Sequence, residues 1–182
     1  MVKRDFIKNI ILTVSLILGL VALRYYVFEP VQITTGMSNN YLKQNDVILA
    51  IKGAEINYGD FVLYQIDNKE YVGRVIAKSG DTVTYMDDVF YRNNEIVEET
   101  YIEVAGHLEY YTEDFTISSL TNGQTDKVSK DSYLILNDTR TNLEDSRSFG
   151  LIQASQIVGR LTFRISPLRE FGFIDTGLAT NG

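Results

Sequence analysis

The side chains able to perform nucleophilic or metal chemistry in this chain are few. Among its 182 residues there is no cysteine, which excludes disulfides, thiol catalysis and zinc–thiolate sites, and there is one histidine, His107. A Ser-His-Asp hydrolase would need a nucleophile and an orienting carboxylate beside that histidine. His107 lies in an acidic, tyrosine-rich stretch, and we interpret it as an ordinary surface or loop residue. No metal site and no cofactor are predicted.

The composition excludes one class of partner and favours one class of structure. The formal net charge is −7, and an acidic chain is repelled by nucleic-acid phosphates, so no nucleic-acid binding is expected. The chain has 12 tyrosines, 9 phenylalanines and only 2 prolines. Aromatic and β-branched segments separated by Gly and Asn favour strands.

The N-terminal residues predict an uncleaved membrane anchor. Residues 9–28 carry Arg24 as their only charge, and about 20 such residues can span a bilayer. The preceding residues 1–8 contain three basic side chains, Lys3, Arg4 and Lys8. Positive charges before a span predict that residues 1–8 are cytoplasmic and that the rest lies on the extracytoplasmic face of the plasma membrane.

Two other interpretations of this apolar segment are weaker. A cleaved secretory signal would need a small-x-small site after its apolar region, and the residues around Arg24 offer none. A buried core helix would show an amphipathic period, whereas this segment is apolar on all sides.

The remaining chain predicts a compact all-β domain over residues 29–175, followed by a flexible tail over residues 176–182. Turn signals separate short apolar strands, and residues 98–130 are the least readable part. A hairpin is expected to turn near Asn93 and Asn94. The predicted strands are residues 46–51, 61–66, 70–77, 82–85, 133–136 and 157–165, the last of which is stopped by Pro167.

Four stretches carry a recognisable pattern: residues 29–46, 58–62, 71–81 and 137–150. They resemble the sequence boxes of type I signal peptidases, the membrane-anchored proteases that remove signal peptides. The last stretch is the most specific, because a chance match to Asp-x-Arg…Asp-Ser-Arg-x-Phe-Gly at that spacing is improbable. The resemblance implies a signal-peptidase-like β ectodomain behind one transmembrane helix.

The chemistry that the resemblance implies is missing from this chain. The family uses a serine nucleophile and a lysine general base, and those positions are Gly36 and Gly73 here. A serine hydroxyl is a poor nucleophile until a base takes its proton, and glycine supplies neither group. The family's lysine-orienting serine corresponds to Leu143, which we expect to be buried and to fill space. Together, the absence of these three side chains predicts a degenerate serine peptidase site and favours a protein that is not an enzyme.

Other residues are poor replacements for this dyad. In an extended segment Ser38 would lie about 6–7 Å farther along than Gly36, so the whole site would have to be rebuilt. Lys69 and Lys78 flank Gly73, and we interpret both as solvated turn charges. Thr34, where some family members place an oxyanion-hole hydroxyl, is interpreted as a structural or groove-lining residue.

The resemblance also implies a peptide groove and a structural ion pair. By analogy with the family, Asp145 and Arg147 are expected to pair beneath the site, and Asp138 and Arg140 to join their network. The candidate groove residues are Thr34, Thr35, Gly36, Met37, Ser38, Tyr71 and Gly73.

Signal peptidase-like proteins that lack the dyad are encoded with pilus genes in Gram-positive bacteria and assist pilin polymerisation by sortases. The resemblance to that group implies a non-catalytic chaperone or assembly factor whose client is a secreted or pilin protein, possibly with a sortase. Two alternatives stay open: an active type I signal peptidase with an atypical site, and a secretion scaffold without a peptide groove.

Overall fold

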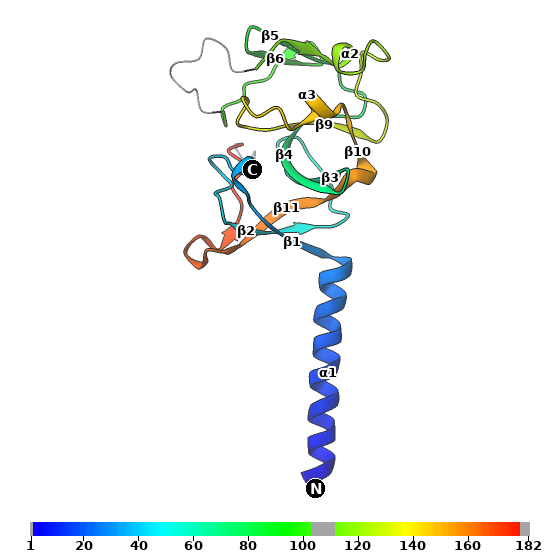
Figure 1. The fold of residues 1–182 in the computed structure, drawn as a ribbon, viewed down its shortest axis with the longest axis vertical. Coiled ribbons are helices and arrows are strands. Elements are labelled where there is room, and N and C mark those ends of the chain that lie inside the picture. Colours follow the sequence, from blue (N-terminus) through cyan, green and yellow to red (C-terminus); the bar gives the residue numbers. More distant parts are fainter. Residues whose placement is uncertain (1, 103–111, 179–182) are drawn as a thin grey trace.

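A long helix and a β-rich body make up the molecule (Figure 1). The computed structural model describes residues 2–102 and 112–178; His107 therefore lies outside the described residues. Helix α1 spans Val2–Tyr26. Its segment of residues 5–26 has a mean hydropathy of 2.3, and none of it is buried against the rest of the protein. Its length and composition are those of a membrane-spanning helix, as the sequence predicted.

Helix α1 begins before the predicted anchor over residues 9–28, because it also includes residues 2–8. The limits of the membrane-spanning part stay a prediction. The helix ends at Tyr26, because Phe28 pairs with Ile51 as the first residue of a strand. Charged side chains hold this junction: Glu29 lies 2.6 Å from Arg24 and 2.9 Å from Lys52.

The main sheet has the strand order β1-β2-β11-β3-β4-β9-β10, with β12 paired to β11. Its strands are β1 (Phe28–Gln32), β2 (Val47–Ile51), β3 (Phe61–Ile66), β4 (Lys69–Lys78), β9 (Ser132–Leu136), β10 (Ile152–Gln153), β11 (Ile157–Ser166) and β12 (Gly172–Phe173). All of its pairings are antiparallel. Strand β11 joins distant parts of the chain, because it pairs with both β2 and β3.

A smaller sheet lies at the end of the body opposite α1 (Figure 1). Its order is β7-β6-β5-β8, from β5 (Val83–Met86), β6 (Val89–Arg92), β7 (Glu95–Ile96) and β8 (Phe115–Thr116). The short helices are α2 (Ile117–Leu120) and α3 (Ser146–Phe149), with 3-10 turns η1 (Thr35–Met37), η2 (Ala154–Gln156) and η3 (Leu168–Glu170).

Turn chemistry explains why the strands end where they do. The predicted hairpin turn at Asn93 and Asn94 is present between β6 and β7, with φ values of 56° and 67°. The same left-handed conformation at Asp67 and Asn68 joins β3 to β4. Asn and Asp adopt this region more readily than other non-glycine residues, so these short polar pairs set the register of the strands on either side.

The all-β prediction is confirmed, although several small elements were not foreseen. The predicted strands agree with the observed ones to within one residue at each end. Strands β8, β10 and β12 have two residues each, too few for a periodic signal. Strand β8 and helix α2 lie within residues 98–130, and Thr116 caps α2 through a reciprocal bond with Ser119.

The described part of the predicted flexible tail is packed. The Thr176 carbonyl accepts a 2.6 Å hydrogen bond from Arg74, and the Leu178 side chain lies against Gly59. Residues 176–178 are not free, because the buried guanidinium of Arg74 donates a hydrogen bond to the backbone there. Residues 179–182 lie outside the described residues.

Candidate functional site

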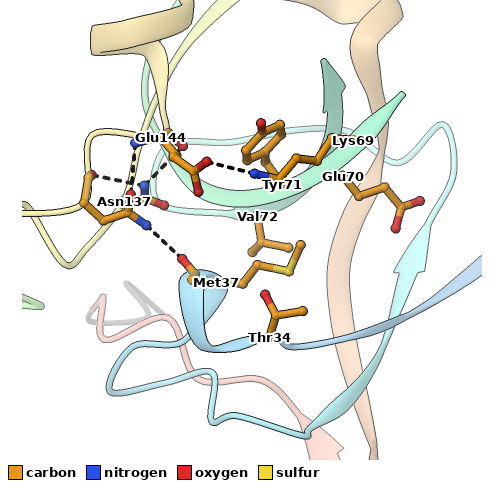
Figure 2. Close-up of a pocket in the computed structure, with 10 residues that line it drawn as sticks. Thr34, Met37, Lys69, Glu70, Tyr71, Val72, Asn137 and Glu144 are labelled. Atoms are coloured by element: carbon orange, nitrogen blue, oxygen red, sulfur yellow. Dashed lines mark hydrogen bonds and ion pairs between the residues drawn. The ribbon is translucent and has the colours of Figure 1, made fainter. Parts of the chain in front are cut away.

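A shallow pocket lies between the η1 turn and the first half of β4 (Figure 2). It has about 280 Å³ of space, including the part that opens to solvent. Thr34 and Met37 form one wall, and the Val72 side chain of β4 faces them from the other side. The lining residues are Thr34, Gly36, Met37, Lys69, Glu70, Tyr71, Val72, Asn137, Asn142 and Glu144.

Gly36 lies in the η1 turn, with room for a side chain. The turn is closed by a 3.1 Å hydrogen bond from the Met37 amide to the Thr34 carbonyl. A Cβ placed on Gly36 would have one heavy-atom neighbour within 4 Å, the Oε2 atom of Glu144 at 4.0 Å. The Asn142 amide group donates to the Gly36 carbonyl at 2.9 Å. The predicted nucleophile position therefore has space for a side chain but carries none.

Gly73 is different, because its side-chain space is already filled. A Cβ there would lie 2.6 Å from Cγ2 of Ile135 and 3.2 Å from the carbonyl oxygen of Leu136. Successive residues of a strand point to opposite faces. Val72 therefore faces the pocket, and Gly73 faces the layer that contains Ile135. The chain at this position is packed around a missing side chain.

The structure gathers some of the predicted groove residues and separates others. Thr34, Gly36, Met37 and Tyr71 all line the pocket. Among the residues named beforehand, Thr35, Ser38 and Gly73 do not. The hydroxyl of Ser38 donates to the Thr35 carbonyl at 2.8 Å, so it caps the turn.

Leu143 contradicts the expectation that it is buried. Its side chain is 41% exposed, because the loop from Asn137 to Asp145 turns its neighbours inward instead. The amide group of Asn137 donates to the carbonyls of Asn142 and Glu144, each at 3.2 Å. These bonds fix the loop backbone, and Leu143 is left at the surface.

An ion pair that sequence reasoning missed stands at the edge of the pocket. Lys69 Nζ lies 2.8 Å from Oε1 of Glu144 and 4.6 Å from the centre of the Tyr71 ring. The hydrogen bond to Glu144 raises the pKa of Lys69. A general base must be deprotonated near the working pH, so this lysine is unsuited to that role. The sequence did offer a signal for the Lys69–Tyr71 contact: Tyr71 lies two positions after Lys69, which places both side chains on one strand face.

Buried ion pairs support the loop that carries Asn142 and Glu144. Asp145 and Arg147 form the predicted pair, 2.7 Å apart and both nearly inaccessible. Asp138 and Arg140 do not join it through their side chains. Asp138 instead holds Arg74 of β4 at 2.7 Å, and Arg140 holds Glu99 at 2.5 Å. The loop is therefore held to β4 through Asp138 and to Glu99 through Arg140.

Two relationships define the site: Gly36 occupies an open turn next to the pocket, and Gly73 lies on the adjoining strand among packed side chains. Hydrolysis by a serine and a lysine requires both side chains within hydrogen-bond reach. Neither glycine position can provide one. Within residues 2–102 and 112–178 there is also no group of three potential metal ligands.

Comparisons with known proteins identify the family of this chain. The family model described as signal peptidase, peptidase S26 matches residues 4–166. The chain belongs to this family. Signal peptidase IB of Staphylococcus aureus is 36% identical over 132 residues, which are 69% of this chain and 69% of that protein. Signal peptidase I of Bacillus caldolyticus is 36% identical over 121 residues, which are 63% of this chain and 64% of that protein.

A solved structure of this family gives the same result for the fold. The crystal structure of a signal peptidase I from Enterococcus faecalis superposes with a TM-score of 0.54 at 29% sequence identity. The match covers 60% of this chain and 98% of that one. The resemblance inferred from the four sequence stretches is confirmed at the level of the signal peptidase family and its fold.

Proposed function

We propose that this signal peptidase homologue binds extended segments of secreted proteins without cutting them. The observation that carries the proposal is the absence of a side chain at both Gly36 and Gly73. The packing around Gly73 adds to it: Ile135 and the Leu136 carbonyl occupy the space a lysine Cβ would need. The backbone at Gly36 has space for a serine side chain, whereas the space for a lysine side chain at Gly73 is filled by neighbouring atoms.

The pocket supports retention of peptide binding. In active family members an extended peptide adds to a strand edge, with shallow pockets for its side chains. Strand β4 pairs with β9 only from Arg74 onward, so Lys69–Val72 have a free edge beside the pocket. That edge offers unpaired backbone groups to an added strand. Loss of the dyad leaves these features unchanged.

The client we propose is a pilin or another secreted protein at the cell surface, with the chain acting as a chaperone or assembly factor for pilus polymerisation. This step rests on the resemblance to dyad-less signal peptidase-like proteins of Gram-positive pilus systems. The proposed topology is a cytoplasmic N-terminus, a single span and an extracytoplasmic β domain. Deletion of the gene should lower the amount of polymerised pilin, and unchanged pilus polymers would contradict the proposal.

Binding itself is tested with the full chain in detergent micelles and a fluorescent signal peptide. We expect saturable binding without cleavage. The comparison variant is Thr34→Lys, which places a long charged side chain on an exposed residue of the pocket wall and should weaken binding. If the signal peptide does not bind, and crosslinking from residue 36 captures no extended peptide, the scaffold alternative without a groove is favoured.

The alternative of an active peptidase requires a serine and a lysine close together. Ser38 is bonded to Thr35, and Lys69 is bonded to Glu144. Both candidate groups are therefore engaged elsewhere. Cleavage abolished by Ser38→Ala would nevertheless favour that alternative over the binding function.

A further inference from the structure

The last described segment of the chain contacts β4 and the loop that follows η1. After β12 the chain runs back toward the level of β4 (Figure 1). Its residues Asp175–Leu178 make a small turn in which the Gly177 amide donates to the Asp175 carboxylate at 2.8 Å. We call these four residues the C-terminal strap. Three of them belong to the predicted tail, and none of them lines the pocket.

The strap is bound to β4 through Arg74. One guanidinium nitrogen of Arg74 donates to the carbonyls of Thr176, at 2.6 Å, and Gly59, at 3.0 Å. The other two nitrogens bond to Asp138, each at 2.7 Å. Arg74 is fully buried, and a hydrogen bond from a charged buried donor is stronger than a neutral one. Arg74 lies two residues beyond Val72 on the same strand face.

The strap also lies against the loop that follows η1. A Cβ at Gly177 would come within 2.1 Å of the Tyr41 hydroxyl, and the φ of Gly177 is 69°. Only glycine fits this approach without strain. The Asn39 side chain accepts hydrogen bonds from the amides of Tyr41 and Leu42, and this loop continues directly from Met37, which lines the pocket. The strap therefore contacts the loop at Tyr41 and β4 at Arg74.

We propose that the C-terminal strap is a latch that holds the η1 loop against β4 and so limits opening of the pocket. The contacts on the strap side are few: one charge-assisted hydrogen bond, the Gly177–Tyr41 approach and the Leu178 side chain, which stays 37% exposed. Ordering four residues opposes these gains. A ligand that prefers the open pocket would compete with these contacts.

The inference deepens the proposed function, because the pocket it controls is the proposed peptide site. It is tested first without any client. Hydrogen exchange is measured on the full chain in micelles and on a variant that ends at Ile174. The hydrogen-bonded amides of residues 37–42 report opening of that segment; they are those of Met37, Ser38, Asn39, Tyr41 and Leu42.

Removal of the strap should speed exchange of these amides about tenfold, the loss expected for one hydrogen bond to a charged group. Exchange in β3 and β11 should not change. A synthetic peptide of residues 175–182, added in excess, should restore protection. The same peptide carrying Gly177→Val should not. Unchanged exchange in the shortened chain, or equal restoration by both peptides, would overturn the latch.

Two full-length variants test the latch even if the shortened chain does not fold. Gly177→Val should release the strap through its clash with Tyr41, whereas Thr176→Ala should leave it in place, because Thr176 bonds through its backbone carbonyl. The fluorescent signal peptide then gives a second readout, with faster association expected for Gly177→Val. If neither variant binds the peptide, the proposed function fails, while the exchange result still decides whether the latch exists.

Discussion

Cγ2 of Ile135 lies 2.6 Å from the point where a Cβ on Gly73 would be placed. Real side chains do not approach so closely, so the isoleucine and a residue larger than glycine cannot share this layer as they stand. Gly73, the predicted general-base position, therefore has no space for a larger side chain as packed. Gly36, the predicted nucleophile position, stays open, and the nearest heavy atom to a Cβ there would be at 4.0 Å.

The two glycines should respond differently to the same substitution. Gly73→Ala is expected to lower the free energy of unfolding by about 1–3 kcal/mol, the usual range for overpacking a core. Gly36→Ala is the matched control and should change stability by less than about 0.5 kcal/mol, as for surface positions. Thermal or denaturant unfolding of the full chain in micelles measures both. Equal losses for the two variants would show that the space at Gly73 is not filled.

Shortening Ile135 should relieve the Gly73→Ala clash. Ile135→Ala alone is expected to cost about 2–5 kcal/mol, because it removes Cγ2 and the rest of a buried side chain. Combined with Gly73→Ala it should cost less than the sum of the two single changes, with a coupling of about 0.5–2 kcal/mol. A double-mutant cycle on unfolding free energies measures this coupling. Strict additivity would mean that the two side chains do not compete for one space.

Restoring the two dyad side chains should not by itself restore cleavage. In Gly36→Ser/Gly73→Lys the lysine would enter the layer filled by Ile135, and Leu143 offers no hydroxyl to orient its amine. We expect this double variant to be destabilised and inactive on a signal-peptide substrate. Adding Ile135→Ala should recover part of the clash-related loss in melting temperature. Efficient cleavage by the double variant would contradict the packing argument.

Among the ion pairs near the pocket, burial should decide the energetic effect. Asp138→Asn leaves Arg74 buried without its charged partner, and removal of one member of a buried pair costs about 3–5 kcal/mol. Lys69→Gln breaks a pair whose side chains are 60% and 53% exposed, so its effect should be much smaller, because solvent screens exposed pairs. Unfolding free energies of the two variants give the comparison. Similar values would refute the ranking by burial.

The Lys69–Glu144 pair should also be visible in a titration. Glu144 raises the pKa of Lys69, so the stabilisation from this pair is fully present below the ordinary lysine pKa. It is lost as pH rises through the higher folded-state pKa. NMR of the lysine side chains through alkaline pH measures the shift. In Glu144→Gln the Lys69 value should fall, and an unchanged value would show that the pair does not form in solution.

The sequence predicted the fold better than the site, for physical reasons visible in single residues. Asn93 and Asn94 mark a turn through their own backbone preferences, so the hairpin could be placed without tertiary information. The filling of the space at Gly73 depends on Ile135, which is 62 residues away and is brought near by the β4–β9 pairing. No local pattern reports that contact.

The same limit explains the errors at the site edge. Leu143 was expected inside because its type is apolar, yet the loop bonds of Asn137 leave it exposed. Lys69 was interpreted as a free turn charge because Glu144 is 75 residues away in sequence. The ion pair Asp145–Arg147 was found because the family motif itself carries both residues.

Incubation of the unaltered full-length chain with a labelled signal-peptide substrate tests the central claim most directly. Signal peptidase IB of Staphylococcus aureus serves as the active control, and binding and product are followed in the same samples. A homologue whose dyad positions are glycine should bind the peptide and form no product while the control cleaves it. Product formation by the unaltered chain that disappears in Ser38→Ala would contradict the account and would require a site rebuilt around that serine.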